Sequence, residues 1–292
     1  MNTSVTPEFT ITLPRGRSLA LGRRTLVMGI VNITPDSFSD GGRFLDSAEA
    51  IEHAASMAEE GADIIDIGGE STRPGAEPVS VQDEISRVIG VIEKISGVCD
   101  LPISIDTTKA EVAHEALAAG ASIVNDVTGL HGEPAVAAVA GEFGAPVIAM
   151  HIKGTPHTMQ ASPTYEDVVA DICTYLRESI ATAEENGVPR EQVIIDPGIG
   201  FGKTVRHNLE IMARLRELGR LGRPILVGTS RKSTIGKITG RPVEQRLFGT
   251  AATVAVCVAN GAHIVRVHDV AAAVDVCRMT DAICRWRDYT ET

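Results

Sequence analysis

Eight short runs of apolar, mostly β-branched residues recur along the chain, and a stretch with helical periodicity follows each of them. Such runs are typical of strands that are buried on both faces, and an intervening helix makes consecutive strands parallel. The runs read TLVMGIV, ADIIDIG, LPISID, ASIVND, APVIAMH, QVIIDPG, RPILVGT and AHIVRVH. The predicted helical segments are residues 47–60, 81–95, 111–119, 134–143, 165–186, 206–218, 244–259 and 270–287.

Eight strand–helix units within 292 residues match a closed (β/α)8 barrel, which typically takes about 250 residues. An open doubly wound sheet is the alternative, but the glycine-rich GxGxxG turn that binds phosphate in such sheets does not follow the first run. Before the repeat, FTITL and SLALG flank the turn-like PRGR and predict a β-hairpin. We therefore predict a single-domain α/β protein in which residues 1–22 form a hairpin that caps the bottom and residues 23–292 form a (β/α)8 (TIM) barrel.

The formal charge of −11 argues against nucleic acid as a partner, because proteins that bind its backbone normally present a basic face. An anionic small molecule is compatible with this charge, since a few cations in a concave site reverse the local field. No apolar run approaches the roughly 20 residues needed to cross a bilayer, and the start MNTSVTPEFT lacks an export signal. We therefore expect a soluble, cytoplasmic protein that does not act at a membrane.

The five cysteines are odd in number and nowhere spaced as CxxC, which predicts neither a disulfide framework nor a zinc site. Cys277 and Cys284 lie seven residues apart in a helical stretch, and therefore on one face of it. We expect the cysteines to pack as small apolar residues and assign them no catalytic role.

Polar side chains follow almost every apolar run. In (β/α)8 barrels the loops at the carboxyl ends of the strands build the active site, so these residues would converge on one mouth. A single such residue is explained equally well as a turn former or a helix cap, but the recurrence at seven or eight strand ends favours a site. The residues are Asn32, Glu70, Ser71, Thr72, Arg73, Asp106, Asn125, Asp126, His151, Asp196, Ser230, Arg231, Lys232, Ser233, Arg266 and His268.

The segments around these strand ends resemble the signature segments of the dihydropteroate synthase family. They read MGIVNITPDSFSDGG, DIIDIGGESTRPGA, SIDTTK, NDVTG, DPGIGFGKT, GTSRKS and RVHDV, while MHIKGTPHTMQ after the fifth run is similar but looser. The long first loop and the STRPG second loop distinguish this family from other pterin-binding barrels, such as methyltetrahydrofolate methyltransferases. The resemblance implies a transferase of folate biosynthesis that condenses 6-hydroxymethyl-7,8-dihydropterin diphosphate with p-aminobenzoate and releases pyrophosphate.

Two other functions stay open at this point. A non-catalytic pterin-binding paralogue would keep the floor of the pocket without turnover, and a pterin methyltransferase would need a corrinoid partner and ignore p-aminobenzoate. The presence of both diphosphate residues and loop residues, among them Asn32, Phe38, Thr72, Arg73 and Arg266, argues for the synthase.

The resemblance assigns the pterin to residues at the strand ends. Asp196 would accept hydrogen bonds from the amino edge of the ring, with Asp106 and Asn125 completing that edge. Lys232 would donate to the ring oxygen and nitrogen from the opposite side, and Phe201 would be a further pterin contact. The alternative for both aspartates is a salt bridge with Lys232 inside the barrel.

The diphosphate would bind to Arg266 and His268, which the resemblance places at the end of the eighth strand, near the N-terminus of the last helix. Asn32 resembles the family's contact to a Mg²⁺ cofactor, whose remaining ligands would be water and phosphate oxygens. Thr72 and Arg73 are further diphosphate contacts that the resemblance implies. The implied catalytic set is Asp106, Lys232, Arg266 and His268.

The resemblance places p-aminobenzoate between loops rather than inside the barrel. The first loop, TPDSFSDGG, is rich in Gly, Ser and Asp, as expected for a lid that orders over ligands. GTSRKSTIG has no insertion, which resembles the drug-sensitive form of the enzyme, so we expect sulfonamides to compete with p-aminobenzoate. The implied p-aminobenzoate contacts are Phe38, Thr72, Arg73, Pro74, Phe201, Lys232 and Ser233.

The implied mechanism is SN1-like. Diphosphate would leave from the pterin methylene first, and the amine would then attack the delocalised cation, without a protein nucleophile. No GxSxG elbow is present that would supply one. The family also suggests a homodimer formed through helices late in the barrel, and apolar residues 250–259 are compatible with it.

Overall fold

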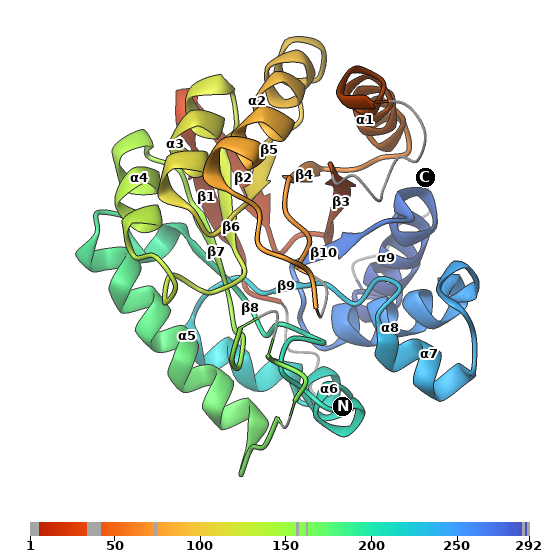
Figure 1. Cartoon of the computed structure of the whole chain (residues 1–292). Coiled ribbons are helices and arrows are strands. Elements are labelled where there is room, and N and C mark those ends of the chain that lie inside the picture. Colours follow the sequence, from red (N-terminus) through yellow and green to blue (C-terminus); the bar gives the residue numbers. More distant parts are fainter. Residues whose placement is uncertain are drawn as a thin grey trace.

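The computed structural model describes residues 6–33, 42–72, 75–155, 158–161, 163–287 and 290. Eight parallel strands form a barrel, and helices surround it (Figure 1). Their order is β8-β7-β6-β5-β4-β3-β10-β9, and a parallel bridge between Ile195 and Ile225 joins the two end strands. The predicted (β/α)8 barrel is confirmed, and every strand overlaps a predicted run. The strands are β3 (Leu26–Asn32), β4 (Ile64–Gly68), β5 (Ile103–Asp106), β6 (Ile123–Asp126), β7 (Val147–Met150), β8 (Val193–Asp196), β9 (Leu226–Val227) and β10 (Ile264–Val267).

Helices follow the strands and cover the outside of the barrel (Figure 1). Within the described ranges, no helix is both long enough and apolar enough to cross a membrane. The helices are α1 (Gly42–Glu59), α2 (Val81–Val98), α3 (Ala110–Ala119), α4 (Ala135–Phe143), α5 (Val168–Glu185), α6 (Val205–Ala213), α7 (Ser233–Thr239), α8 (Leu247–Ala259) and α9 (Val270–Cys284). Short 3-10 helices span Pro14–Gly16, Arg190–Gln192, Leu215–Leu221 and Val243–Gln245.

Several helices differ from the predicted segments. α1 begins at Gly42 rather than at residue 47, α8 begins at Leu247 rather than at residue 244, and α6 ends at Ala213 rather than at residue 218, because a 3-10 helix follows it. Periodicity does not predict α7, which has only seven residues, contains a glycine and ends before Gly240, whose backbone is in the left-handed region (φ 70°). The predicted α5 begins three residues later than expected, because Asp167 caps it by accepting hydrogen bonds from the backbone amides of Val169 and Ala170. Local capping therefore decides boundaries that periodicity leaves uncertain.

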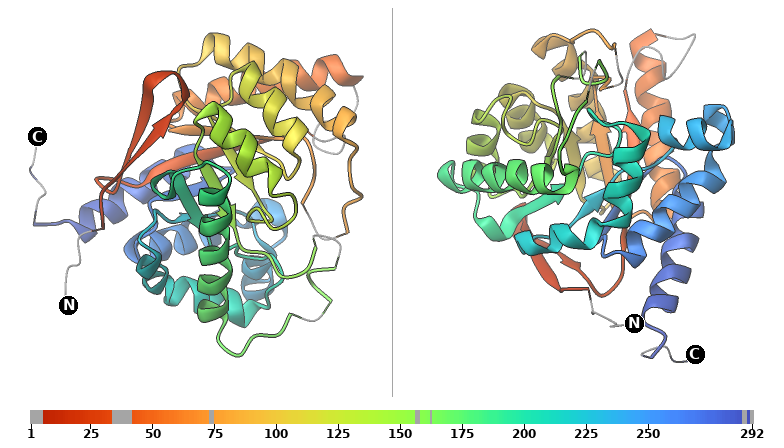
Figure 2. Two further views of the ribbon diagram at one scale, coloured as in Figure 1. Left: turned by 90° about the vertical axis from the view of Figure 1, so that its left-hand side faces the viewer. Right: turned by 90° about the horizontal axis from the view of Figure 1, so that it is seen from below.

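The N-terminal hairpin closes the bottom of the barrel, as predicted. Strands β1 (Phe9–Leu13) and β2 (Arg17–Leu21) pair antiparallel, and Figure 2 shows them across one end of the barrel. Their inward side chains share one buried cluster with residues at the start of the barrel strands, and this apolar layer excludes water from the lower barrel. The cluster consists of Ile11, Leu13, Leu19, Leu21, Leu26, Met28, Ile64, Ile123, Ile148, Ile194, Leu226 and Ile264.

Alternation along each strand separates two environments. Residues such as Ile65 and Ile67 face outward and pack under the helices, whereas Ile64 and Asp66 face the barrel interior. The interior is apolar at its base and polar toward the carboxyl ends of the strands, where Asp106 lies beside Asn125 in the strand register. This gradient places the polar groups at the open end of a rigid apolar base.

Candidate active site

The polar interior centres on Arg266. Its Nε and Nη2 donate to Asp66 Oδ2 at 2.6 and 2.5 Å, and Nη2 also donates to Asp106 Oδ2 at 2.7 Å. Asn125 Nδ2 lies 3.4 Å from both carboxylate oxygens of Asp66. Strands β4, β5, β6 and β10 thus hold one network of two carboxylates, an amide and a guanidinium inside the barrel.

Asp66 is the member of this network that sequence reasoning missed. It is fully buried and lies in the middle of β4 rather than at its end, where the polar residues were sought. The available signal was a charged residue inside the apolar run DIIDIG, in phase with the inward-facing Ile64. Such a residue needs a buried partner, and Arg266 supplies it.

Asp196 ends β8 on the same inner surface. Its Oδ1 accepts a hydrogen bond from the backbone amide of Gly198 at 2.7 Å, which fixes one face of the carboxyl group. Burial raises the pKa of Asp196 to about 6, and the charges of Lys232, Lys203 and Arg266 oppose this rise. Burial likewise raises the pKa of Asp106 to about 7, against the lowering effect of Arg266.

Lys232 precedes α7 and reaches over the turn that follows β8. Its Nζ lies 4.2 Å from the centroid of the Phe201 ring, and its side chain passes the open face of Gly200. Burial and the charge of Arg266 lower the pKa of Lys232 to about 8. Among the described contacts Asp106 pairs with Arg266, and no salt bridge joins Lys232 to Asp106 or Asp196, so the alternative of an interior salt bridge with Lys232 is wrong.

Comparisons with known proteins identify the family to which this chain belongs. Residues 28–268 match the model of the pterin binding enzymes. The chain is 51% identical over 277 residues to dihydropteroate synthase of Synechocystis sp., covering 94% of this chain and 95% of the relative. The chain belongs to the dihydropteroate synthase family.

Solved structures of the family have the same fold. A structure of the Yersinia pestis dihydropteroate synthase with a sulfonamide drug complex has a TM-score of 0.88 at 42% identity, covering 94% of this chain and 99% of that one. The Xanthomonas albilineans dihydropteroate synthase with 4-aminobenzoic acid also has a TM-score of 0.88, at 44% identity, covering 96% and 99% of the two chains. The expected family and barrel are therefore confirmed.

His268 is neutral in this member of the dihydropteroate synthase family. Burial, and then the charges of Arg231 and Arg266, lower its pKa to about 4. The hydroxyl of Ser230 accepts a hydrogen bond from the His268 backbone amide at 3.2 Å and lies 3.0 Å from Nδ1. Ser230 therefore contacts both the backbone and the ring of His268 and holds the imidazole at the end of β10. A neutral imidazole at this position can donate one hydrogen bond to an anion.

A buried ion cluster anchors the second loop of this family member. Lys109 Nζ contacts Glu70 Oε2 and Glu84 Oε2, each at 2.5 Å, and the Glu84 side chain is fully buried on α2. Glu70 Oε1 accepts from the backbone amide of Val79 at 3.0 Å, so it joins both ends of the loop. Thr72 lies within that loop and is half-buried.

The remaining predicted contacts lie around the barrel mouth or outside the described residues. Asn32 is the half-buried last residue of β3, paired in register with Gly68, and Ser233 is the exposed first residue of α7. Phe38, Arg73 and Pro74 lie outside the described residues, so their assignments stay predictions.

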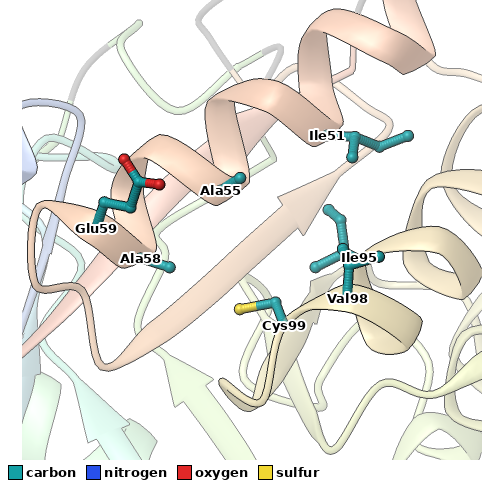
Figure 3. Close-up of a pocket in the computed structure, with 7 residues that line it drawn as sticks. All are labelled: Ile51, Ala55, Ala58, Glu59, Ile95, Val98 and Cys99. Atoms are coloured by element: carbon teal, nitrogen blue, oxygen red, sulfur yellow. The ribbon is translucent and has the colours of Figure 1, made fainter.

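A separate cavity of about 210 Å³ lies between α1 and α2, away from the strand ends (Figure 3). Its lining is mostly aliphatic, with one carboxylate, Glu59, and one thiol, Cys99. Binding pockets need several converging polar groups to orient a ligand, and none of the lining residues directly follows a barrel strand. The chemistry of a dihydropteroate synthase therefore belongs to the barrel mouth.

Proposed function

We propose that the barrel mouth of this chain condenses 6-hydroxymethyl-7,8-dihydropterin diphosphate with p-aminobenzoate to form 7,8-dihydropteroate and pyrophosphate. One observation carries the proposal: buried acceptors and cationic donors converge on one polar floor above an apolar base. A pterin edge presents adjacent donors and acceptors, which this set complements. The membership in the dihydropteroate synthase family supports the same activity.

In this proposal the pterin lies flat over the floor. The ionised carboxylate of Asp196 accepts from the amino group and a ring N–H, and Asn125 and Asp106 complete the edge. Lys232 donates to the ring oxygen and nitrogen from the opposite side, above Phe201. Because Arg266 pairs with both Asp66 and Asp106, these buried carboxylates share a cationic partner before the pterin binds.

The diphosphate is proposed to bind at the end of β10. Arg266 uses Nε and Nη2 for its carboxylate partners, which leaves Nη1 to reach an anion at the mouth. His268 donates from Nε2, and a bound diphosphate would raise its pKa by favouring the charged ring. Thr72 and Arg73 remain proposed contacts from the second loop.

A Mg²⁺ cofactor is part of this proposal. The described residues contain no group of three or more His, Cys, Asp or Glu side chains arranged around a metal, so they offer no protein cage. Mg²⁺ commonly keeps several waters and binds through one or two protein oxygens together with substrate phosphates, a pattern that the amide oxygen of Asn32 fits. When bound, the ion would neutralise charge on the departing diphosphate.

The proposed reaction is SN1-like. As the bond from the methylene to the diphosphate breaks, Arg266 and His268 hold the leaving group. The carboxylates of the floor stabilise the positive charge that develops on the pterin, and no protein nucleophile is needed. The amine nitrogen then attacks the methylene carbon and loses its proton.

The proposed wall for p-aminobenzoate combines Lys232, Ser233 and Phe201 with the loop residues Phe38, Thr72, Arg73 and Pro74. The complexes of the Xanthomonas relative with 4-aminobenzoic acid and of the Yersinia relative with a sulfonamide support an aromatic amine subsite that sulfonamides enter. The exposed Ser233 stands at the mouth next to Lys232, where a second substrate can approach the pterin.

We also propose a homodimer and a cytoplasmic location. Apolar side chains project from the late helices, with Phe248 on α8 86% exposed and Trp286 after α9 63% exposed, as expected for a covered face. All five cysteines are free, which is compatible with a reducing compartment. Light scattering of the wild type and of Phe248→Glu tests the dimer.

The deciding experiment measures pyrophosphate release from the pterin diphosphate with Mg²⁺, with and without p-aminobenzoate, for the wild type and Lys232→Ala. We expect the wild type to release pyrophosphate only when the amine is present and to form dihydropteroate, and we expect Lys232→Ala to lose most of this activity. Pterin binding without release would indicate a non-catalytic paralogue. A trapped covalent enzyme–pterin adduct would contradict the SN1-like mechanism.

A further inference from the structure

Lys203 is a buried lysine that the proposed reaction does not use. Only 3% of it is exposed, and it lies in the turn that follows β8. Its Nζ contacts His151 Nδ1 at 2.8 Å, the His151 carbonyl oxygen at 3.3 Å and the Phe201 carbonyl oxygen at 2.9 Å. Three polar atoms from two loops therefore surround the Lys203 amine.

The surroundings of Lys203 lack a direct counter-charge. Within the part of the chain that the structure describes, no ion pair joins Lys203 to a carboxylate, and Asp196 acts on it only at longer range. Burial lowers the pKa of Lys203 well below its usual value, and it lowers that of His151 to about 2, so the imidazole is neutral. An apolar side chain would fill this space at a lower desolvation cost, so packing alone does not explain a lysine.

The contacts of Lys203 join two loops of the barrel mouth. His151 directly follows β7, and Phe201 lies in the turn after β8. The two segments already touch at Gly198, where an added Cβ would come within 1.9 Å of the His151 carbonyl oxygen. Tyr165 donates to the carbonyl oxygen of Gly202 at 2.7 Å from the outer side. Lys203 therefore holds the turn from within.

The turn that Lys203 holds carries the ring beneath Lys232. Phe201 is half-buried, and its ring centroid lies 4.2 Å from Lys232 Nζ. Lys203 Nζ donates to the carbonyl oxygen of Phe201, so the position of the Phe201 ring depends on Lys203. Asp196, by contrast, is held separately by the β8 ladder and the Gly198 amide.

We propose that Lys203 is a positioning residue for the second substrate: it ties the Phe201 turn to His151 and so sets the aromatic wall against which the amine is aligned. This inference rests on the proposed function. Lys203 acts through Phe201 and touches neither substrate. A displacement of such a wall by about 1 Å is enough to cost an enzyme one to two orders of magnitude in rate.

The test compares Lys203→Met with Lys153→Met as a matched control. Lys153 lies in the same loop layer, but it is exposed, and its Nζ lies 4.2 Å over the Tyr165 ring on the outside. For Lys203→Met we expect the KM for p-aminobenzoate to rise about tenfold, while the dissociation constant of the pterin changes less than about threefold. Lys153→Met should match the wild type in both. An equal loss of affinity for both substrates in Lys203→Met would overturn the proposal.

A double-mutant cycle tests whether the effect passes through Phe201. In the background of Phe201→Ala, Lys203→Met should change the KM for p-aminobenzoate by less than about twofold, because the wall is already gone. Additive effects would show that Lys203 acts by another route. Lys203→Arg, which keeps the donors, should recover part of the affinity for p-aminobenzoate.

Folding and function are separated within the same experiment. Circular dichroism follows every variant, and Lys203→Gln, which keeps one amide donor, replaces the methionine variant if that one does not fold. If neither folds, Lys203 is a folding requirement and the positioning role is wrong. A wild type that forms no dihydropteroate refutes the proposed function itself, whereas an active wild type with an unaffected Lys203→Met refutes only this inference.

Discussion

Arg266 and Asp66 form an ion pair inside the barrel, with 2.5 Å between Nη2 and Oδ2, although 200 residues separate them in the chain. Asp66 is fully buried, while the Arg266 side chain is 21% exposed toward the mouth. The pair thus links the apolar base to the residues proposed to bind diphosphate. Asp66 orients Arg266 without reaching the mouth itself.

Removal of this buried carboxylate should destabilise the protein. We expect Asp66→Ala to lower the free energy of unfolding by about 3 kcal/mol, because it leaves Arg266 with one carboxylate partner instead of two. Urea denaturation measures the change. Glu8→Ala is the control, since its ion pair with Arg23 is largely exposed and should contribute less than about 1 kcal/mol. Equal losses in the two variants would contradict the role of Asp66.

Pterin binding should weaken below pH 6. Only the ionised carboxylate of Asp196 can accept from the amino group and the ring N–H with both oxygens. Burial raises its pKa to about 6, so protonation below that pH turns one of the two acceptors into a donor. We expect kcat/KM for the pterin diphosphate to fall about tenfold per pH unit on the acid side. For Asp196→Asn, kcat/KM should be lower than in the wild type at every pH and should lack the inflection near pH 6. Asp106→Asn should keep that inflection. An inflection that survives in Asp196→Asn assigns it to another group.

The turn after β8 should not accept a side chain at Gly198. Gly198 and Gly144 both have positive φ, 66° and 64°, but an added Cβ meets the His151 carbonyl oxygen at 1.9 Å only at Gly198 and nothing within 4 Å at Gly144. Gly144→Ala should therefore cost about 1–2 kcal/mol from the backbone alone, and Gly198→Ala at least about 3 kcal/mol. Chemical denaturation of both variants isolates the clash, and similar losses would show that His151 moves aside.

Loss of the ion cluster around Lys109 should destabilise the protein more than loss of an exposed lysine. Lys109→Met leaves the buried Glu84 beside Glu70 without a cation, and we expect a loss of about 3 kcal/mol in the free energy of unfolding. Lys94→Met on the exposed side of α2 should change it by less than about 0.5 kcal/mol. A small effect in Lys109→Met would mean that water or a protonated carboxyl compensates.

Sulfonamides should compete with p-aminobenzoate and not with the pterin. The expectation follows from the uninterrupted GTSRKSTIG segment and the sulfonamide complex of the Yersinia relative. Steady-state kinetics at several concentrations of each substrate should show a raised KM for p-aminobenzoate alone. An inhibitor constant close to that of a resistant enzyme would contradict it.

Periodicity and motif position predicted much of the site. The eight runs became the eight barrel strands, because a strand buried on both faces needs a continuous apolar segment. The residues after them, such as Asp106, Asn125 and Asp196, do converge, since parallel strands end on one face. Asp66 escaped this reasoning because it lies within a strand, and α7 escaped it because seven residues are too few to show a helical period.

Local patterns that repeat along the chain are enough to predict the barrel, its capping hairpin and the face on which the polar residues gather. The pairing of the charges follows only from the folded structure. Arg266 pairs with Asp66 and Asp106, so Asp106 does not pair with Lys232, and Lys203 lies between His151 and Phe201. Such pairings depend on strand register and on distances across the barrel, which no local pattern encodes.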